Sequence, residues 1–127
     1  MNPFIGVWRY VGTWGDGDPA NRGAHRKGFI FYTASGEMAA QVAPVRETKM
    51  AGAESTDDET KSALADYVSY LGTYSVDEHA GTVTHHRQAN VQPGPLSDVV
   101  RAYEFKGDRL ILRPVGTKQE IVWERIR

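Results

Sequence analysis

Short β-forming segments recur along most of this chain, and turn-forming residues separate them at short intervals. Strands that alternate apolar and polar side chains and follow one another through tight turns pair as an antiparallel meander. Eight strands are enough for such a sheet to close and to leave room inside for side chains or one small ligand. The pattern therefore predicts an all-β fold, an eight-stranded antiparallel up-and-down β-barrel. Its strands are expected at residues 7–13, 28–33, 37–42, 73–76, 82–87, 99–105, 109–115 and 119–126.

The segment between the third and fourth predicted strands fits a helix. Thr56 and Glu59 have the spacing of a capping box, and the acidic residues after Thr56 suit the positive end of a helix dipole. Gly72 stands where a left-handed C-cap is expected. We therefore expect one amphipathic helix that lies against an apolar surface. Its apolar face has the spacing i, i+3, i+4 and i+7: Leu64, Tyr67, Val68 and Leu71.

Composition narrows the class of protein and its partners. At 127 residues the chain is expected to form a single domain over residues 1–127. A net charge of -1 argues against nucleic acid and against a membrane surface as partners. The absence of cysteine excludes disulfides, thiolate metal sites and cysteine nucleophiles. No run approaches the ~18 apolar residues of a membrane span and no signal-peptide pattern opens the sequence, so a cytoplasmic location is expected.

Several stretches of the sequence resemble one family. Gly6-Val7-Trp8, with Arg125 on the last strand, resembles the lipocalin arrangement, in which a tryptophan near the closed end of the barrel packs beneath an arginine of the final strand. Three further stretches resemble, in the same order, the bacterial and fungal lipocalin-like domain family: residues 28–33 with 36–38, residues 72–77 with 81–85, and residues 103–110 with 123–125. This resemblance implies a compact ligand-holding barrel. It implies no single activity, because relatives include cofactor-free cyclases of natural-product pathways.

Strand alternation predicts which side chains line the lumen. Successive residues of a strand face opposite sides of a sheet, so the more apolar set of each strand should point inward. The strand at 28–33 leaves both choices open, because its two phenylalanines compete with Ile30 and Tyr32. The inward residues predicted for the other strands are Trp8, Tyr10, Met38, Ala40, Val42, Tyr74, Val76, Val83, His85, Arg101, Tyr103, Phe105, Leu110, Leu112, Ile121, Trp123 and Arg125.

A mostly apolar cavity with a few convergent polar groups is the usual composition of a small-molecule site. Arg101 is the most informative of these groups, because burying it unpaired would cost several kcal/mol. It would need a carboxylate, a bound ligand or water, and the alternative is that it points outward or stacks on a tyrosine. The residues predicted to contact a ligand are Tyr10, Met38, Ala40, Tyr74, His85, Arg101, Tyr103, Leu112 and Trp123.

Two functions follow from this lumen. The first is binding of a small, largely apolar organic molecule. The alternative is a cofactor-independent isomerase or cyclase that folds a polyketide-like or terpenoid-like substrate, with Arg101, Tyr103 and His85 polarising a carbonyl or moving a proton. A filled barrel without a ligand is a third option. His85 and His86 face opposite sides of a strand and cannot bind one metal together, so no metal site is predicted. No cofactor is expected. The exposed β-surface allows a homodimer.

Overall fold

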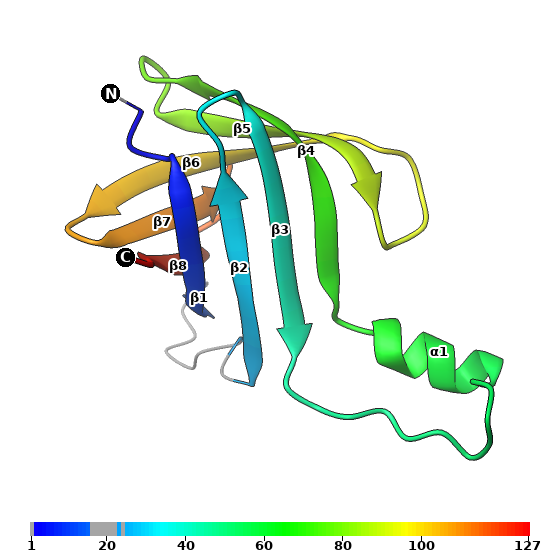
Figure 1. Ribbon diagram of the computed structural model, residues 1–127. Coiled ribbons are helices and arrows are strands. Elements are labelled where there is room, and N and C mark those ends of the chain that lie inside the picture. The colour runs from blue at the N-terminus through cyan, green and yellow to red at the C-terminus, as the bar shows by residue number, and fades with distance from the viewer. Residues whose placement is uncertain (1, 16–22, 24) are drawn as a thin grey trace.

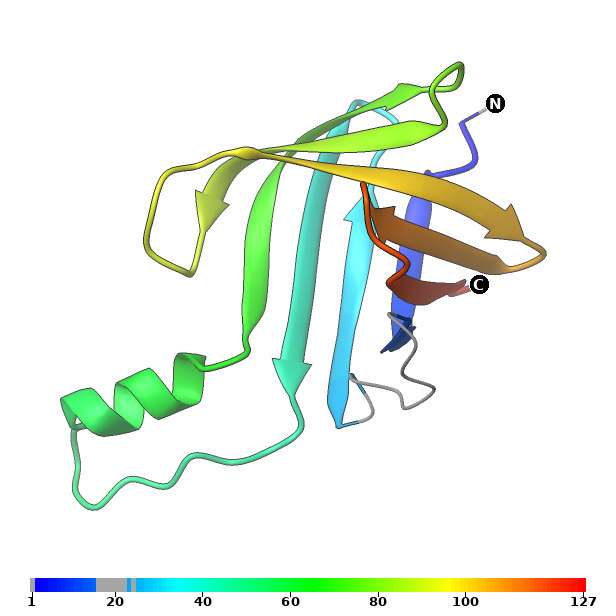
Figure 2. The same ribbon diagram turned by 180° about the vertical axis from the view of Figure 1, so that it is seen from behind.

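The structure, a computed structural model, describes residues 2–15, 23 and 25–127. The described residues form strands that wrap around a common interior, and one helix (Figures 1 and 2). Within them, no helix has the length and apolar character needed to cross a membrane. In chain order the elements are β1 (Gly6–Trp14), β2 (Arg26–Tyr32), β3 (Glu37–Pro44), α1 (Asp57–Leu64), β4 (Val68–Asp77), β5 (Thr82–Asn90), β6 (Asp98–Lys106), β7 (Arg109–Pro114) and β8 (Glu120–Arg125).

Hydrogen bonding runs continuously around the barrel. Each strand pairs antiparallel with the next one in the chain, and β1 pairs with β8 as well as with β2. Trp8 on β1 is opposite Ile30 of β2 on one side and opposite Arg125 of β8 on the other. The predicted fold class, a closed eight-stranded antiparallel barrel with a helix between the third and fourth strands, is confirmed.

The helix α1 is shorter and more exposed than its sequence pattern predicts. It begins with the predicted capping box, because Glu59 N donates to Thr56 Oγ1 at 3.2 Å and Thr56 N donates to Glu59 Oε1 at 2.8 Å. It ends at Leu64, two residues before Asp66, whose backbone is left-handed with a φ of 61°. None of its residues is buried, and it projects away from the barrel near the end of β3 (Figures 1 and 2). The expectation that it lies against an apolar surface is therefore wrong.

The second half of the predicted helical face belongs to β4. Val68 pairs with Val42 of β3, and the pairing continues through residues 68–73. These residues are rich in β-branched and aromatic side chains, which favour strands, and pairing along β3 outweighs the local helical spacing. Gly72, predicted as a helix cap, lies in β4 at an irregularity of the β4–β5 pairing. A Cβ atom there would come within 1.9 Å of the His86 carbonyl oxygen, so the close approach of the strands requires glycine.

The inward residues predicted from alternation do form the interior. They are buried, pack against the buried cluster or line a cavity, except that Arg125 covers the Trp8 ring at one end. The open choice on β2 is resolved, because Ile30 and Tyr32 are 1% and 2% exposed whereas the two phenylalanines are 37% and 39% exposed. Both phenylalanines therefore lie on the outer surface of the barrel.

Aromatic side chains fill one end of the barrel, here called the closed end. Phe4, from the turn before β1, is fully buried at its centre. Its ring centroid lies 5.0 Å from those of Tyr103 and Phe105 and 5.2 Å from that of Tyr32, all in edge-to-face geometry. Such pairs contribute stability beyond their buried area. The closed end consists of Phe4, Trp8, Tyr32, Tyr74, Tyr103 and Phe105.

Arg125 fastens the chain segment that covers the closed end. Its guanidinium carbon lies 4.2 Å from the centroid of the Trp8 ring, so the packing of arginine over tryptophan that the resemblance implies is confirmed, and it is a cation–π contact. The same guanidinium donates to the backbone oxygen of Ile5 at 2.9 Å and to that of Pro3 at 2.6 Å. Trp8 adds a further hydrogen bond from Nε1 to the Phe4 oxygen at 2.9 Å. The last strand therefore holds the first residues of the chain in place.

Candidate ligand-binding site

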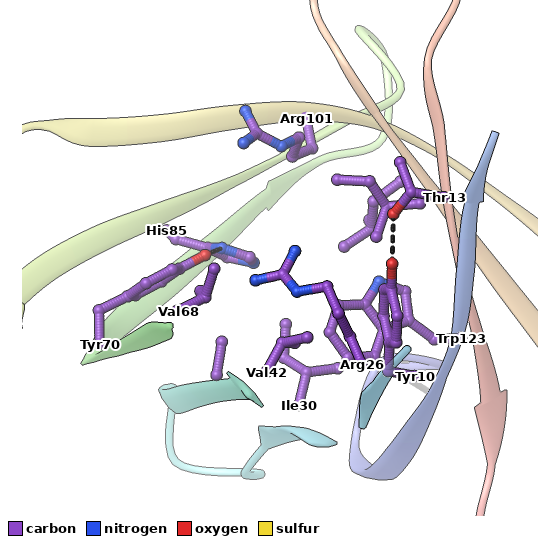
Figure 3. A pocket seen from close by; sticks show the side chains of 13 residues that line it. Tyr10, Thr13, Arg26, Ile30, Val42, Val68, Tyr70, His85, Arg101 and Trp123 are labelled. Carbon is purple, nitrogen blue, oxygen red and sulfur yellow. Dashed lines mark hydrogen bonds between the residues drawn. The ribbon is translucent and has the colours of Figure 1, made fainter. Parts of the chain in front are cut away.

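The other end of the interior contains a cavity. Its volume is about 150 Å³, and it opens partly to solvent. Every strand of the barrel contributes at least one side chain to its wall (Figure 3). The wall is mostly aliphatic and aromatic, with a few polar groups among these side chains. The lining residues are Tyr10, Thr13, Arg26, Ile30, Ala40, Val42, Val68, Tyr70, His85, Arg101, Leu112, Ile121 and Trp123.

His85 on β5 lies between the cavity and the closed end. Its side chain is 1% exposed, with Nε2 2.7 Å from the Tyr32 hydroxyl and Nδ1 2.7 Å from the Tyr70 hydroxyl. Burial, and after it the charge of Arg101, lowers the pKa of His85 to about 3, so the ring is neutral at pH 7. The neighbouring His86 is on the outer face, where its Nδ1 lies 3.1 Å from an Asp98 oxygen. The two histidines do face opposite sides.

Arg101 enters the cavity from β6, which decides between the inward and outward alternatives (Figure 3). Its Nη1 donates to the backbone oxygen of the adjacent Val100 at 3.1 Å. Among the described residues no acidic side chain forms an ion pair with it. Burial lowers the pKa of Arg101 below its ordinary value, but a guanidinium remains protonated at neutral pH. Within the described residues this partly buried positive charge has no carboxylate against it, an arrangement that is unfavourable unless water or a ligand pairs with it.

Two more donor groups on the cavity wall are incompletely paired. Arg26, the first residue of β2, donates from Nη2 to the backbone oxygen of Asp66, but its Nε is buried and has no partner in the described part of the chain. The indole Nε1 of Trp123 is in the same condition. In Figure 3 the Arg26 guanidinium points into the space between His85 and Trp123. Buried N–H groups are nearly always hydrogen-bonded, so each of these marks a place where a bound molecule would accept.

The structure brings part of the predicted ligand-contact set to the cavity. Met38, Tyr74 and Tyr103 have the predicted inward orientation but lie toward the closed end, where Tyr103 packs on Phe4. Of the three residues assigned to catalysis, Arg101 and His85 border the cavity and Tyr103 does not. The roles of all these residues remain predictions. The predicted residues at the cavity are Tyr10, Ala40, His85, Arg101, Leu112 and Trp123.

Sequence reasoning missed four residues of the wall: Thr13, Arg26, Val68 and Tyr70. The signal for Val68 and Tyr70 was present, since they alternate with Ser69 as strand residues do. Arg26 has the same strand parity as Ile30, but it precedes the predicted start of that strand. A strand extended to its charged first residue would have included it.

The family model and one solved structure with a TM-score above 0.5 agree with this architecture. The model of the lipocalin-like domain family matches residues 5–126. A DUF4847 family protein from Bacteroides vulgatus has a similar structure, with a TM-score of 0.54 and 13% identity over 95% of this chain and 92% of that one. The wild-type fluorescent protein UnaG matches with a TM-score of 0.41 and 12% identity over 97% of each chain. The search of curated proteins finds no match. The extent of the family match shows that this chain belongs to the lipocalin-like domain family.

Proposed function

We propose that the protein binds a small, largely apolar organic molecule in the barrel cavity. The observation that carries this proposal is the wall itself, in which aliphatic and aromatic side chains from every strand surround about 150 Å³ of space. An apolar cavity of about that volume can hold a molecule the size of benzene. The enclosed part of the cavity thus suits a group of about one ring, and the opening allows a longer molecule to extend toward solvent.

The isomerase or cyclase alternative has less support. A general base works best when its pKa lies near the operating pH, and burial lowers the pKa of His85 to about 3. Tyr103 packs in the closed end rather than at the cavity, so it is separated from the other two residues assigned to catalysis. Catalysis by shape alone would need neither residue, and turnover of a candidate substrate remains its direct test.

A neutral fluorescent dye such as aminoanthracene, which brightens in apolar surroundings, tests binding. We expect saturable binding to the wild-type protein. Ala40 on β3 lines the cavity and is 3% exposed, whereas the adjacent Ala39 is on the outer face of the strand. Ala40→Leu puts three more carbon atoms into the cavity and should weaken dye binding about tenfold or more, because overpacked sites cannot relax freely. Ala39→Leu adds the same group outside and should leave binding unchanged.

Two results would count against the proposal. Equal dye binding by A40L and A39L, with both variants folded, would place the dye outside the barrel. Absence of saturable binding to the wild-type protein, for the dye and for a panel of ring-sized neutral molecules, would favour a filled structural barrel.

A further inference from the structure

The polar groups of the cavity wall have one chemical character in common. Arg26 and Arg101 both line the cavity, and among the described residues that line it none is acidic (Figure 3). Arg87 lies beside one lining residue, since its guanidinium carbon is 5.7 Å from the centroid of the Tyr70 ring, and it donates to Ser97. The wall is therefore apolar and positively charged.

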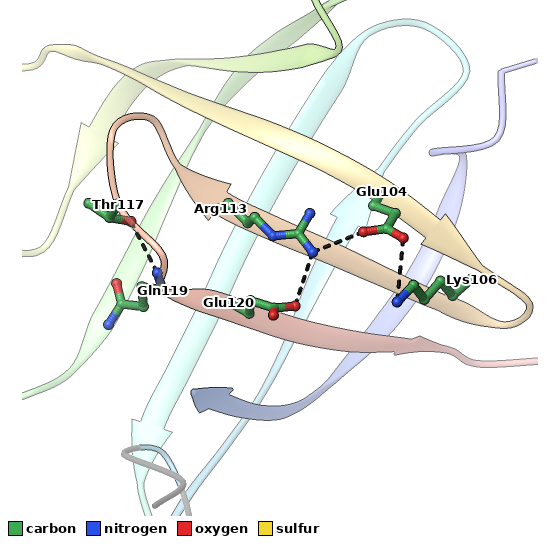
Figure 4. Close-up of polar contacts among 6 residues, drawn as sticks. All are labelled: Glu104, Lys106, Arg113, Thr117, Gln119 and Glu120. Atoms are coloured by element: carbon green, nitrogen blue, oxygen red, sulfur yellow. Dashed lines mark hydrogen bonds and ion pairs between the residues drawn. The ribbon is translucent and has the colours of Figure 1, made fainter. Parts of the chain in front are cut away.

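Some basic side chains on the outer surface of the barrel form ion pairs with carboxylates. Arg113 donates to Glu104 at 2.9 Å and to Glu120 at 3.1 Å, and Lys106 lies 3.5 Å from the second oxygen of Glu104 (Figure 4). Arg9 pairs with Glu124 at 2.7 Å in the same way. Arg9 and Arg113 thus have carboxylate partners on the outer surface, although water would solvate a surface cation without any. The cations that border the cavity need such a partner more and have none in the described structure.

The hydrogen bonds of His85 turn a further donor toward the cavity. The neutral ring has one N–H and one acceptor nitrogen, so one of its two tyrosine partners donates to it and the other accepts from it. The Tyr32 hydroxyl is buried, and its only hydrogen-bond partner in the described structure is His85 Nε2. Tyr32 must therefore donate to Nε2, since otherwise its proton would be buried without an acceptor.

The tautomer of His85 follows from this assignment. Nε2 accepts from Tyr32, so the proton of the ring is on Nδ1 and is donated to the Tyr70 oxygen. The Tyr70 hydroxyl proton then has no acceptor among the three side chains Tyr32, His85 and Tyr70. Because Tyr70 lines the cavity, its O–H is available to a molecule bound there.

The cavity wall thus presents several hydrogen-bond donors that lack acceptors among the described residues. Within the part of the chain that the structure describes, Arg26 Nε and Trp123 Nε1 are buried without partners, Arg101 has only a backbone oxygen, and Tyr70 offers a hydroxyl proton. All four groups donate, and two of them are charged. A ligand group that pairs with all of these donors and with both positive charges must be negatively charged and must only accept hydrogen bonds. A carboxylate has this property, and arginine binds it with strong, charge-assisted hydrogen bonds.

We propose that the natural ligand is a small organic acid, whose carboxylate accepts from Arg101 and Arg26 while its apolar part lies against the aliphatic wall. This inference rests on the proposed function, and it specifies the class of molecule bound. The apolar part has Ile30, Val42 and Leu112 to pack against. Tyr70 would donate to the second oxygen of the acid.

Two probes with one carbon skeleton test the inference. Phenylbutyrate carries a carboxylate where phenylbutanol carries a hydroxyl, and both should displace aminoanthracene from the wild-type protein at pH 7. We expect phenylbutyrate to bind at least about tenfold more tightly, as charge-assisted hydrogen bonds exceed neutral ones. Arg101→Met should weaken phenylbutyrate by about 10–100-fold and change phenylbutanol by less than about threefold. Arg26→Met should act in the same direction.

Matched controls separate a local effect from net charge and from other counter-ions. Arg9→Gln removes an exposed arginine of the outer surface and should leave the preference for the acid unchanged. Asp16 and Asp18 lie outside the described residues, so the D16N/D18N variant is included, and it should also keep the preference. A tenfold or greater gain in phenylbutyrate affinity in D16N/D18N would show that the arginines already have partners, and it would overturn the inference.

The outcomes distinguish the inference from the function on which it rests. Equal binding of the two probes, or tighter binding of the alcohol, would overturn the inference that the ligand is an acid. The proposal that the barrel binds a ligand would still stand. Binding of the dye without displacement by phenylbutyrate would have the same meaning. Failure of the dye and of both probes would instead overturn the proposed function. A preference for the acid that survives in both R101M and R26M would show that other residues hold it, which also overturns the inference.

Discussion

The closed end and the cavity end of this barrel are built from the same strands but are filled differently. At the closed end, Phe4 occupies the axis and three ring centroids lie within 5.2 Å of its own. Arg125 at this end has an aromatic face and two backbone oxygens as partners. At the cavity end the space is open, and within the described residues two arginines and an indole N–H lack a full set of hydrogen-bond acceptors. Packing gives stability at one end, and unsatisfied groups keep the other available for binding.

The largest effect is expected from substitutions of two tryptophans, one at each end of the barrel. Trp8→Ala at the closed end should lower the free energy of unfolding by about 3–5 kcal/mol, because it removes a fully buried ring from a filled site. Trp123→Phe at the cavity should cost less, about 1–2 kcal/mol, because it removes only part of a buried ring, and the N–H that it also removes has no partner in the described structure. Urea unfolding of both variants measures the two values. A loss in W123F as large as that in W8A would remove the difference in packing between the two ends.

The second test uses His85, which links the two ends through Tyr32 and Tyr70. Its pKa is lowered from 6.5 to about 3 in the folded protein, mainly by burial. Between those values the unfolded chain binds a proton that the folded chain does not bind. The free energy of unfolding should therefore fall below pH 6.5, by up to about 1.4 kcal/mol per pH unit, and this contribution should be constant above it.

The range from pH 6.5 to pH 5 lies between the unfolded and folded pKa values of His85, so its protonation contributes to the slope there. His85→Gln keeps a donor and an acceptor on the side chain and should flatten the dependence. An unchanged slope in H85Q would assign the effect to another group.

The third test compares two arginines. Arg125→Met should destabilise the protein by about 1–3 kcal/mol, because it removes the cation–π contact and two hydrogen bonds. Arg101→Met should instead stabilise the empty protein by about 1 kcal/mol, since it replaces a poorly paired charge with an apolar side chain of similar length. Thermal unfolding without ligand compares them. Equal destabilisation by both variants would remove the distinction between the ends.

The smallest effect is expected outside the barrel. Thr56→Ala removes the cap of α1 and should reduce its helicity, which amide exchange would detect. Because no residue of α1 is buried, the global free energy of unfolding should change by less than about 0.5 kcal/mol. A larger change would show that the helix contributes to the stability of the barrel.

Local chemistry was sufficient to predict most of the fold. Alternation and turn residues located the strands, and alternation also predicted that Tyr10, His85 and Arg101 point inward. The helix boundary was wrong because residues 64–71 fit the spacing of a helical face as well as a strand, and only pairing with β3 decides between them. That error also concealed Tyr70, which belongs to the cavity wall.

The candidate site was less predictable than the fold. Alternation gives the side of the sheet but not the depth along the barrel. The depth of a side chain along the barrel depends on the tilt and stagger of the strands, and these cannot be read from the sequence of one strand. For this reason Met38, Tyr74 and Tyr103 were grouped with cavity residues although they lie toward the closed end. Which arginine keeps a carboxylate partner also depends on contacts between distant strands.

The contribution of every strand to the cavity wall has a consequence for how occupancy could be detected. A molecule held by the whole circumference cannot stay bound when any one strand detaches, so binding should slow hydrogen exchange around the entire ladder rather than in one patch. At about 100 times its dissociation constant, a ligand would add about 2.7 kcal/mol to the resistance of the fold against unfolding. A simple melting screen of small acids would then report on the interior directly.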